Sequence, residues 1–136
     1  MNTLCSGEIT DGGRSVFLSA ARLMDDGSLV VTFEGEIYVN NPKRYLTGYL
    51  DELARLLPGQ PIASMTLDFV KVRRCNDVGF YAIKDIVDAV QNLVFGPIMV
   101  RRLAGDEWQQ EALPILLNLA EESNAERTTF ENVQAS

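Results

Sequence analysis

The chain of 136 residues contains no histidine. Histidine is the commonest general base and the commonest metal ligand in proteins, so its absence removes the usual starting point for both kinds of site. The two cysteines, Cys5 and Cys75, are far apart in the sequence and predict neither a metal cluster nor a disulfide framework. The chain also lacks a Gly-rich phosphate loop and a nucleophile elbow. These absences favour a protein that is not an enzyme and that uses no metal and no cofactor.

Long hydrophobic runs are also missing. No segment approaches the ~20 consecutive apolar residues that a membrane-spanning helix needs. The first residues, MNTLCSGEITDGG, have neither the basic flank nor the apolar stretch of a secretory signal. The net charge is −7, which repels the phosphate backbone of nucleic acids. We therefore expect a cytoplasmic protein that binds neither membranes nor nucleic acids.

The composition is that of a folded domain. Apolar residues make up 46% of the chain and charged residues 23%, as in ordinary globular proteins. A chain of this length can bury a core without disulfides. Residues 1–14 are rich in glycine and polar side chains and predict a flexible N-terminus. Residues 15–133 predict a single α/β domain.

Hydrophobic periodicity divides this domain into eight elements. Two β-prone runs flank the turn sequence from Asp25 to Ser28 and predict an antiparallel hairpin. Asn41 and Pro42 predict the cap and the first residue of a helix, and Pro114 predicts a kink or a division in the last helical segment. The order β-β-α-β-α-β-α-β predicts a mixed sheet with packed helices. The predicted elements occupy residues 15–23, 29–37, 42–59, 62–70, 80–94, 98–103, 105–122 and 127–133.

A polar and basic segment, KVRRCNDVG, separates the predicted strand at 62–70 from the helix that follows it. Loops that follow parallel strands meet at one edge of the sheet, where ligands and partners commonly bind. Such loops predict a basic rim that suits an anionic ligand or an acidic protein surface, unless the side chains pair with nearby acidic residues. The predicted rim contains seven of the chain's twelve Lys and Arg residues. These seven are Lys43, Arg44, Lys71, Arg73, Arg74, Arg101 and Arg102.

The segments LVVTFEGEI and MTLDFVKVRRCNDVGFYAIKDIVDAV resemble the STAS domain, the module of bacterial anti-sigma factor antagonists. The resemblance rests on Glu34-Gly35-Glu36 at a strand end, on Leu67-Asp68 before a hinge, and on Asn76 to Gly79 at the hinge that opens a helix. It covers residues 16–133 and implies a mixed sheet and a non-enzymatic signalling role. The implied partner is a protein, either an anti-sigma factor with kinase-like character or a partner regulated by a phosphatase.

The hinge departs from the family at its switch position. In the STAS proteins that this chain resembles, a partner kinase phosphorylates the second hinge serine, which breaks binding. Val78 stands at that position and Asp77 at the position of the other serine. Val78 cannot accept phosphate, whereas Asp77 can cap the helix and place a permanent negative charge at its N-terminus. The hinge is therefore either a structural cap in a domain that lost its switch or part of a constitutive binder.

Three functions remain open at this point. A small-anion or nucleotide sensor would use the basic rim, and a homo-oligomeric scaffold, with a homodimer as its simplest form, would use Trp108 and the LPILLNL segment. The leading interpretation is a regulatory module that binds a protein through Asn40, Asn41, Arg73, Arg74, Asn76, Asp77 and Val78. The aromatic residues at helical spacing are expected in the core or at its margin, and they are Tyr45, Tyr49, Phe80 and Tyr81.

Overall fold

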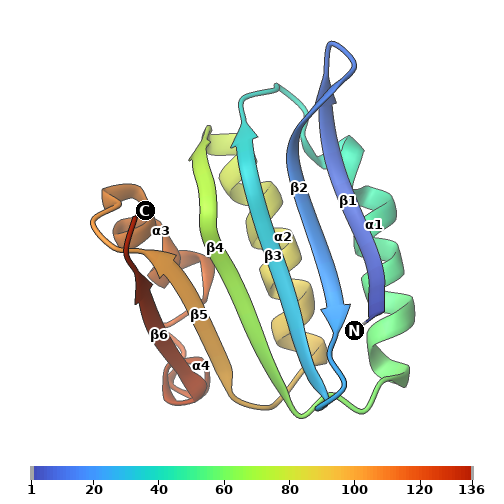
Figure 1. Cartoon of the computed structure of the whole chain (residues 1–136), viewed down its shortest axis with the longest axis vertical. Coiled ribbons are helices and arrows are strands. Elements are labelled where there is room, and N and C mark those ends of the chain that lie inside the picture. The colour runs from blue at the N-terminus through green and yellow to red at the C-terminus, as the bar shows by residue number, and fades with distance from the viewer. Residues whose placement is uncertain (1, 136) are drawn as a thin grey trace.

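The computed structural model describes residues 2–135, which form one six-stranded sheet and four helices. The helices lie on one face of the sheet and leave the other face uncovered (Figure 1). In chain order the elements are β1 (Asn2–Asp11), β2 (Arg14–Leu23), β3 (Ser28–Ile37), α1 (Lys43–Leu56), a short 3-10 turn (Leu57–Gly59), β4 (Ser64–Cys75), α2 (Asp77–Leu93), β5 (Ile98–Leu103), α3 (Glu107–Leu116), α4 (Glu122–Arg127) and β6 (Thr128–Val133).

The strands lie side by side in chain order, from β1 at one edge to β6 at the other. Neighbours among β1, β2 and β3 are antiparallel, and neighbours from β3 to β6 are parallel. Short turns join the antiparallel strands, whereas each parallel connection contains a helix. The predicted mixed α/β sheet with an N-terminal antiparallel hairpin is confirmed, and the sheet has one more strand than the predicted order.

That additional strand lies in the segment that the sequence predicts to be a flexible N-terminus. Residues 2–11 instead form β1, which pairs along its whole length with β2. Cys5 and Ile9 are buried in the core. Gly7 lies so close to Tyr49 of α1 that an added Cβ would stand 2.7 Å from the Tyr49 Cβ. The sheet therefore begins before residue 15, and β1 lacked a clear sequence signal because it contains Gly7 and several polar residues.

The hairpin of β2 and β3 is confirmed, and its turn is fixed by local polar contacts. The Asp26 carboxylate accepts hydrogen bonds from the Ser28 backbone N–H at 3.0 Å and from the Ser28 hydroxyl at 2.7 Å. Gly27 has φ 88°, a left-handed conformation that glycine adopts without steric cost. The chain thereby reverses direction between two strands whose inward side chains enter the same core.

Helix α1 begins at Lys43, and its first residues differ from the prediction. Pro42 rather than Asn41 occupies the N-cap position, and no side chain caps the helix. Asn41 is exposed in the preceding loop, while the Tyr45 N–H donates to the Pro42 carbonyl at 3.1 Å. Asn41 is therefore available at the surface because it is not engaged as a cap.

Helix α2 packs against the sheet with the face that its sequence spacing predicts. Ile83, Val87 and Val90 are fully buried. Beneath the helix, Phe33 of β3 and Phe69 of β4 stack with their ring centroids 4.6 Å apart. Burial of this apolar surface is the main force that holds the helix layer on the sheet.

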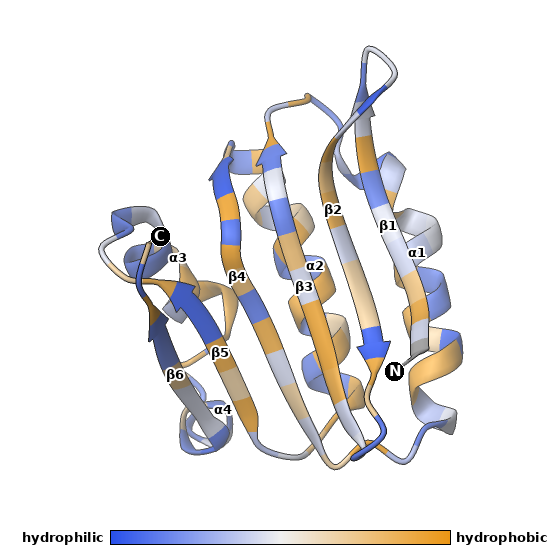
Figure 2. Cartoon of the chain, viewed as in Figure 1, coloured by the Kyte–Doolittle hydropathy of each residue, from blue (hydrophilic) through white to orange (hydrophobic). Residues whose placement is uncertain are grey.

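Strand β4 is longer than predicted, because the basic part of the junction is strand and not loop. It continues from Val70 to Cys75, and Figure 2 shows hydrophilic residues at its end. β3 pairs with it as far as Cys75, whereas β5 pairs only with Met65–Asp68. The part of β4 after Asp68, which is more than half of the strand, therefore has a neighbouring strand of the described chain on one side only.

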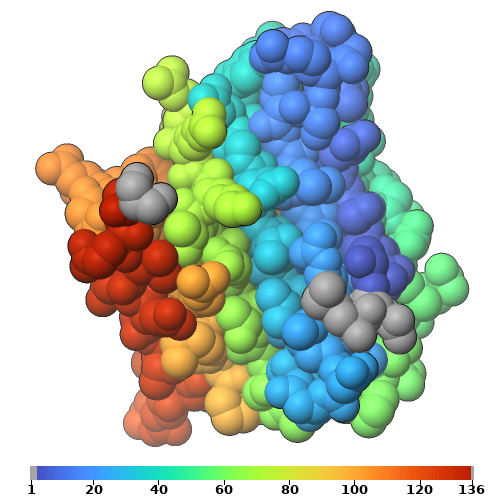
Figure 3. Space-filling view, viewed as in Figure 1, coloured from blue at the N-terminus to red at the C-terminus, as the bar shows by residue number. Residues whose placement is uncertain are grey.

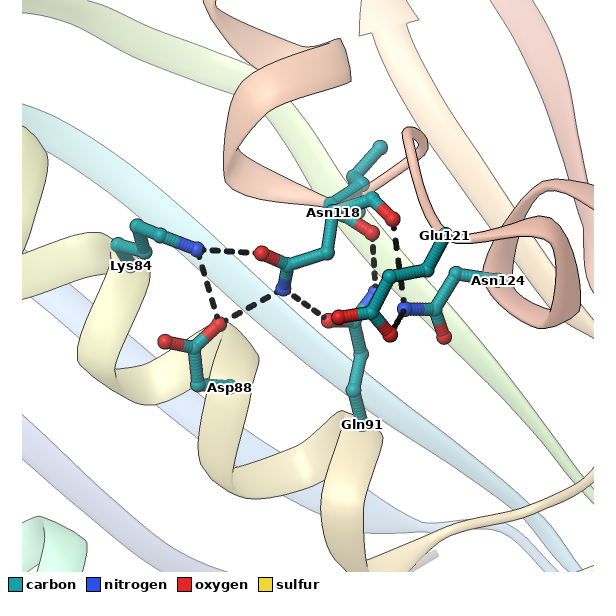
Figure 4. Close-up of polar contacts among 7 residues, drawn as sticks. Lys84, Asp88, Gln91, Asn118, Glu121 and Asn124 are labelled. Carbon is teal, nitrogen blue, oxygen red and sulfur yellow. Dashed lines mark hydrogen bonds and ion pairs between the residues drawn. The ribbon is translucent and has the colours of Figure 1, made fainter.

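The last helical segment is divided in two, as predicted, although Pro114 itself lies inside α3, two residues before its end. Helix α3 ends at Leu116, and α4 follows after a short connection. In this connection Asn118 has φ 55°, and its side-chain amide donates to Asp88 and Gln91 of α2, each at 2.8 Å (Figure 4). The connection is thus fixed to α2 by polar contacts.

Candidate partner-binding surface at the start of helix α2

The hinge between β4 and α2 is organised by Asn76. Its side-chain oxygen accepts a hydrogen bond from the Gly79 N–H at 2.8 Å, which makes Asn76 the N-cap of α2. Its side-chain nitrogen donates to the Val39 carbonyl at 3.1 Å, so the same residue holds the loop after β3 against the hinge. Asp77 is therefore not the cap, and the prediction on this point is wrong.

Asp77 and Val78 lie in the first turn of α2, and both are exposed. Asp77 places a carboxylate at the positive end of the helix dipole, as expected. Gly79 is buried, and an added Cβ would stand 2.6 Å from Cγ2 of Ile37. The glycine of the hinge is therefore required by close packing on β3, while the two residues before it face outward.

Tyr81 is the residue that sequence reasoning missed. It was expected in the core or at its margin, yet it is 57% exposed. Its ring stands nearly perpendicular to that of Phe80, with centroids 5.3 Å apart. A signal was present in the sequence, because Val78 and Tyr81 are three residues apart and fall outside the spacing of the buried face. Such a pair lies together on the outer side of a helix.

Two hollows flank Tyr81. One, of about 190 Å³, is lined by the loop before α1 together with Val78 and Tyr81, and the other, of about 350 Å³, lies between the hinge and Trp108. Trp108 is partly buried and packs against the core. We call the exposed residues around these hollows, together with the partly buried Asn76, the hinge surface, and they are Asn40, Asn41, Asn76, Asp77, Val78 and Tyr81.

The hinge surface unites five of the seven predicted binding residues. Asn40 and Asn41 line the first hollow, and Asn76 and Asp77 line the second. Arg73 and Arg74 are exposed near the end of β4. Neither lines these hollows, and Arg73 instead lines a larger hollow near the uncovered face of the sheet. The predicted set is therefore divided between two places.

The predicted basic rim is not continuous. β5 runs beside the first part of β4, so Arg101 lies opposite Asp68 and not near Arg74. Its guanidinium forms an ion pair with Asp68 at 2.6 Å, and the Arg102 guanidinium lies 4.2 Å from the centroid of the Phe130 ring. The rim prediction is therefore wrong for β5, because the strand ends much earlier along the sheet than β4.

The thiol of Cys75, beside the hinge, is not activated. Its Sγ donates to the Asn76 carbonyl at 3.3 Å. Burial, with a smaller contribution from the charge of Asp77, raises the pKa of Cys75 to about 12. A thiol with this pKa is protonated at neutral pH and is a poor nucleophile.

Two further properties bear on the chemistry of the chain. Within residues 2–135, no group of three or more Cys, Asp or Glu side chains is arranged to hold a metal ion. None of the helices in the described part has the length and apolar character that crossing a membrane requires. The site offers apolar and polar contact surface and no evident reactive group.

No protein-family model and no curated protein sequence matches the chain. Among solved structures, SiaC of Pseudomonas aeruginosa matches with a TM-score of 0.58 and 21% sequence identity, over 99% of this chain and 100% of that chain. A chain in the crystal structure of the diguanylate cyclase SiaD in complex with its activator SiaC, from the same organism, matches with a TM-score of 0.48 and 22% identity, over 87% of this chain and 92% of that chain. The first likeness establishes that this chain has the fold of SiaC, while membership of the STAS family stays a prediction.

Proposed function

We propose that this chain is a non-enzymatic regulatory module that binds another protein through the hinge surface. The observation that carries the proposal is the exposure of two apolar side chains side by side, Val78 at 44% and Tyr81 at 57%. Val78 borders the hollow that Asn40 and Asn41 line, and Tyr81 borders both that hollow and the one lined by Asn76 and Asp77. Exposed aromatic residues next to hollows, with polar groups around them, are typical of the energetic centre of a protein interface.

The rigidity of this surface supports the same function. The side chain of Asn76 holds the loop after β3 and the first turn of α2 in one arrangement. Buried Gly79 packs on Ile37 beneath them. A surface that is already ordered before binding loses little conformational entropy when a partner docks, which favours affinity.

We also propose that this module is not switched by phosphorylation at the hinge. Val78 has no hydroxyl group, and no serine or threonine occurs between Lys71 and Ala82. The carboxylate of Asp77 gives the helix start a permanent charge that a phosphate would otherwise supply on demand. Binding would then depend on the amount of the partner. The cytoplasmic and bacterial setting stays a prediction of the sequence.

The other two functions receive less support. A small-anion sensor would need several free cations in one place, but Lys43 forms an ion pair with Asp85 at 3.1 Å and Arg101 with Asp68. Lys71 and Arg73, which are unpaired within the described chain, border a hollow that has apolar walls. Arg44 is engaged with the Tyr45 ring and hydroxyl. A scaffold built on Trp108 would use a side chain that is already partly buried in its own domain. Sedimentation of the purified protein measures directly whether it forms a homodimer.

The hinge surface can be tested with Tyr81→Ala. Two classes of protein from the source organism are candidate partners. Diguanylate cyclases are the first choice, because the chain has the fold of SiaC, and anti-sigma kinases are the second, because the STAS resemblance implies them. For the partner that binds, we expect Tyr81→Ala to weaken the affinity by tenfold or more, since truncating a central aromatic residue costs about 2 kcal/mol or more. Binding is measured by titration calorimetry.

Phe95→Ala is the matched control for this experiment. Phe95 is 82% exposed, but it lies just beyond the other end of α2, away from the hinge surface. We expect this variant to bind like the unaltered protein. If Tyr81→Ala also binds with unaltered affinity, the hinge surface is not the interface. Phosphate incorporated anywhere in residues 71–82 by a cognate kinase would contradict the absence of a switch.

A further inference from the structure

A larger hollow lies near the uncovered face of the sheet. It has a volume of about 920 Å³ and is bordered by the beginning of β2, the ends of β3, β4 and β5, and Asp106. A second hollow of about 340 Å³ shares Leu18, Glu34, Val70 and Lys71 with it, so the two form one depression. We call this depression the sheet cleft. Figure 3 shows that no helix covers the strands on this face of the molecule.

The cleft exists because β4 and β5 separate. Their pairing ends at Asp68 and Arg101, although β4 continues to Cys75. The buried side chain of Gln109 closes the first part of the gap, since its amide nitrogen donates to the Phe69 carbonyl at 2.8 Å and to the Val72 carbonyl at 3.2 Å. Beyond Val72, no strand of the described chain lies beside β4 on this side.

The charges in the cleft are unusual for this chain, whose net charge is −7. Lys71 and Arg73 both border the cleft and are exposed. Within residues 2–135 neither side chain forms an ion pair or a side-chain hydrogen bond. Two of the bordering carboxylates are engaged, because Asp68 pairs with Arg101 and Asp106 accepts a hydrogen bond from the Gln109 backbone N–H. The third bordering carboxylate, Glu34, lies opposite Lys71 in the strand pairing, so the cleft presents two free cations and one free carboxylate to a ligand.

The cleft also has apolar walls. Val16, Leu18, Val70 and Leu103 line it, and each is only partly buried. A small inorganic anion would contact the two cations but would leave this apolar surface in water. A ligand that alternates acidic and apolar groups would use both, and an extended chain presents alternate side chains to opposite sides.

We infer that the sheet cleft binds an extended acidic segment of a partner protein. The segment lies alongside the end of β4, with carboxylates on Lys71 and Arg73 and with apolar side chains on the wall that Leu103 provides. The backbone of β4 after Val72 is open to a neighbouring strand, which is how sheets commonly take up extended peptides. This site is separate from the hinge surface, and either can bind without the other.

The test is a selection of random eight-residue peptides displayed on phage against the full chain. We expect the enriched peptides to alternate Asp or Glu with apolar residues. Synthetic copies should bind about ten- to hundredfold more weakly to the double variant Lys71→Glu/Arg73→Glu, because charge-assisted contacts become repulsive. Their affinity for the unaltered protein should fall as salt is raised, because exposed charges are screened.

Arg44→Glu/Arg55→Glu is the matched control, since it makes the same change of charge on exposed residues of α1. We expect this variant and Tyr81→Ala to bind the peptides as the unaltered protein does, and melting curves confirm that all variants are folded. The inference is overturned if no peptide is enriched, if the enriched peptides are not acidic, or if both double variants bind equally. Loss of peptide binding in Tyr81→Ala would assign the peptides to the hinge surface and overturn it as well.

Discussion

The two ends of helix α2 are stabilised differently. A residue next to the helix in the sequence caps its start, whereas a residue of a distant helix binds the carbonyl groups at its end. At its start, the cap is Asn76, which directly precedes the helix, and Tyr81 in the second turn remains exposed. At its end, Arg127 of α4 donates to the carbonyl of Val94 at 2.6 Å and to that of Gln91 at 3.0 Å. The start is thus ordered with little cover, whereas the end is covered by another helix.

The side of α2 that faces the α3–α4 connection is closed in the same way. Lys84 donates to Asp88 and to Asn118, and Asn118 in turn donates to Asp88 and Gln91 (Figure 4). Within residues 2–135, no buried side-chain nitrogen or oxygen lacks a hydrogen-bond partner. The difference between the two ends teaches that contacts from another helix fix the end of α2, whereas its start is held by its own cap and the loop after β3. Apolar side chains are exposed at both ends, because Phe95 just beyond the last turn is 82% exposed.

The largest effect on stability is expected at the end of α2 that α4 covers. Arg127→Met removes the donors to the Gln91 and Val94 carbonyls while it keeps much of the side-chain volume. We expect the free energy of unfolding to fall by about 3 kcal/mol, because hydrogen bonds from charged groups are worth about 1.5–3 kcal/mol each and are not additive. Urea denaturation followed by circular dichroism measures this loss.

Arg55→Met provides the control for that change. Arg55 is exposed on α1, and its replacement should alter the free energy of unfolding by no more than about 0.5 kcal/mol. Equal stabilities of the two variants would show that Arg127 does not complete α2.

At the start of α2, Asn76→Ala should lower the stability less than Arg127→Met does, and it should also weaken partner binding. It removes the cap on the Gly79 N–H and the bond to the Val39 carbonyl. We expect a loss of about 2 kcal/mol, from about 1 kcal/mol for an N-cap and a similar amount for the second bond. Asn76→Asp retains the acceptor and loses the donor, so about half of the loss should remain.

The two Asn76 variants also sharpen the link to function. If Asn76 orders the hinge surface, both should weaken partner binding in addition to destabilising the fold. Unaltered partner binding by folded Asn76→Ala would show that the arrangement of the loop after β3 is not needed for recognition.

The smallest expected effect is the pH dependence of stability that arises from Cys75, beside the start of α2. The pKa of Cys75 is raised from 9.0 to about 12, chiefly by burial. The thiol ionises more readily in the unfolded chain, so its contribution to stability is complete below pH 9 and is lost as the pH rises toward 12. Urea denaturation at pH 7 and at pH 10.5 should therefore show a smaller alkaline loss for Cys75→Ala than for the unaltered protein.

Cys5 must be treated separately in that experiment, because burial also raises its pKa to about 11. Cys5 lies away from the hinge, so Cys5→Ala should reduce the loss of stability at alkaline pH without any change in partner binding. An alkaline loss that is the same with and without Cys75 would contradict the assignment of the effect to its thiol.

Most elements of the fold could be predicted from local sequence. The Asp26–Gly27 turn, the spacing of Ile83, Val87 and Val90, and the division near Pro114 are each specified by neighbouring residues. Strand β1 could not be predicted, because Gly7 and the polar residues around it become a strand only when β2 supplies its hydrogen-bond partners and Tyr49 packs on the glycine.

The candidate site was predicted in part. The hinge, its glycine and the outward position of Val78 follow from the sequence, whereas the choice of Asn76 over Asp77 as the cap depends on which side chain reaches the Gly79 N–H. Tyr81 was expected in the core or at its margin because aromatic residues at helical spacing usually are buried. Its position three residues after Val78, outside the spacing of the buried residues, was the signal that its side chain faces solvent.

The sequence by itself determined the class of the fold, the hairpin, the helix faces and a hinge without a hydroxyl group. These features depend on residues that are close together in the chain, where spacing and turn chemistry act directly. Only the tertiary structure decided that β4 extends past β5, that Arg101 meets Asp68 and not Arg74, and that Asn40, Asn41 and Tyr81 share one surface. The physical reason is that strand register and loop contacts are fixed by partners distant in the sequence, which local patterns do not encode.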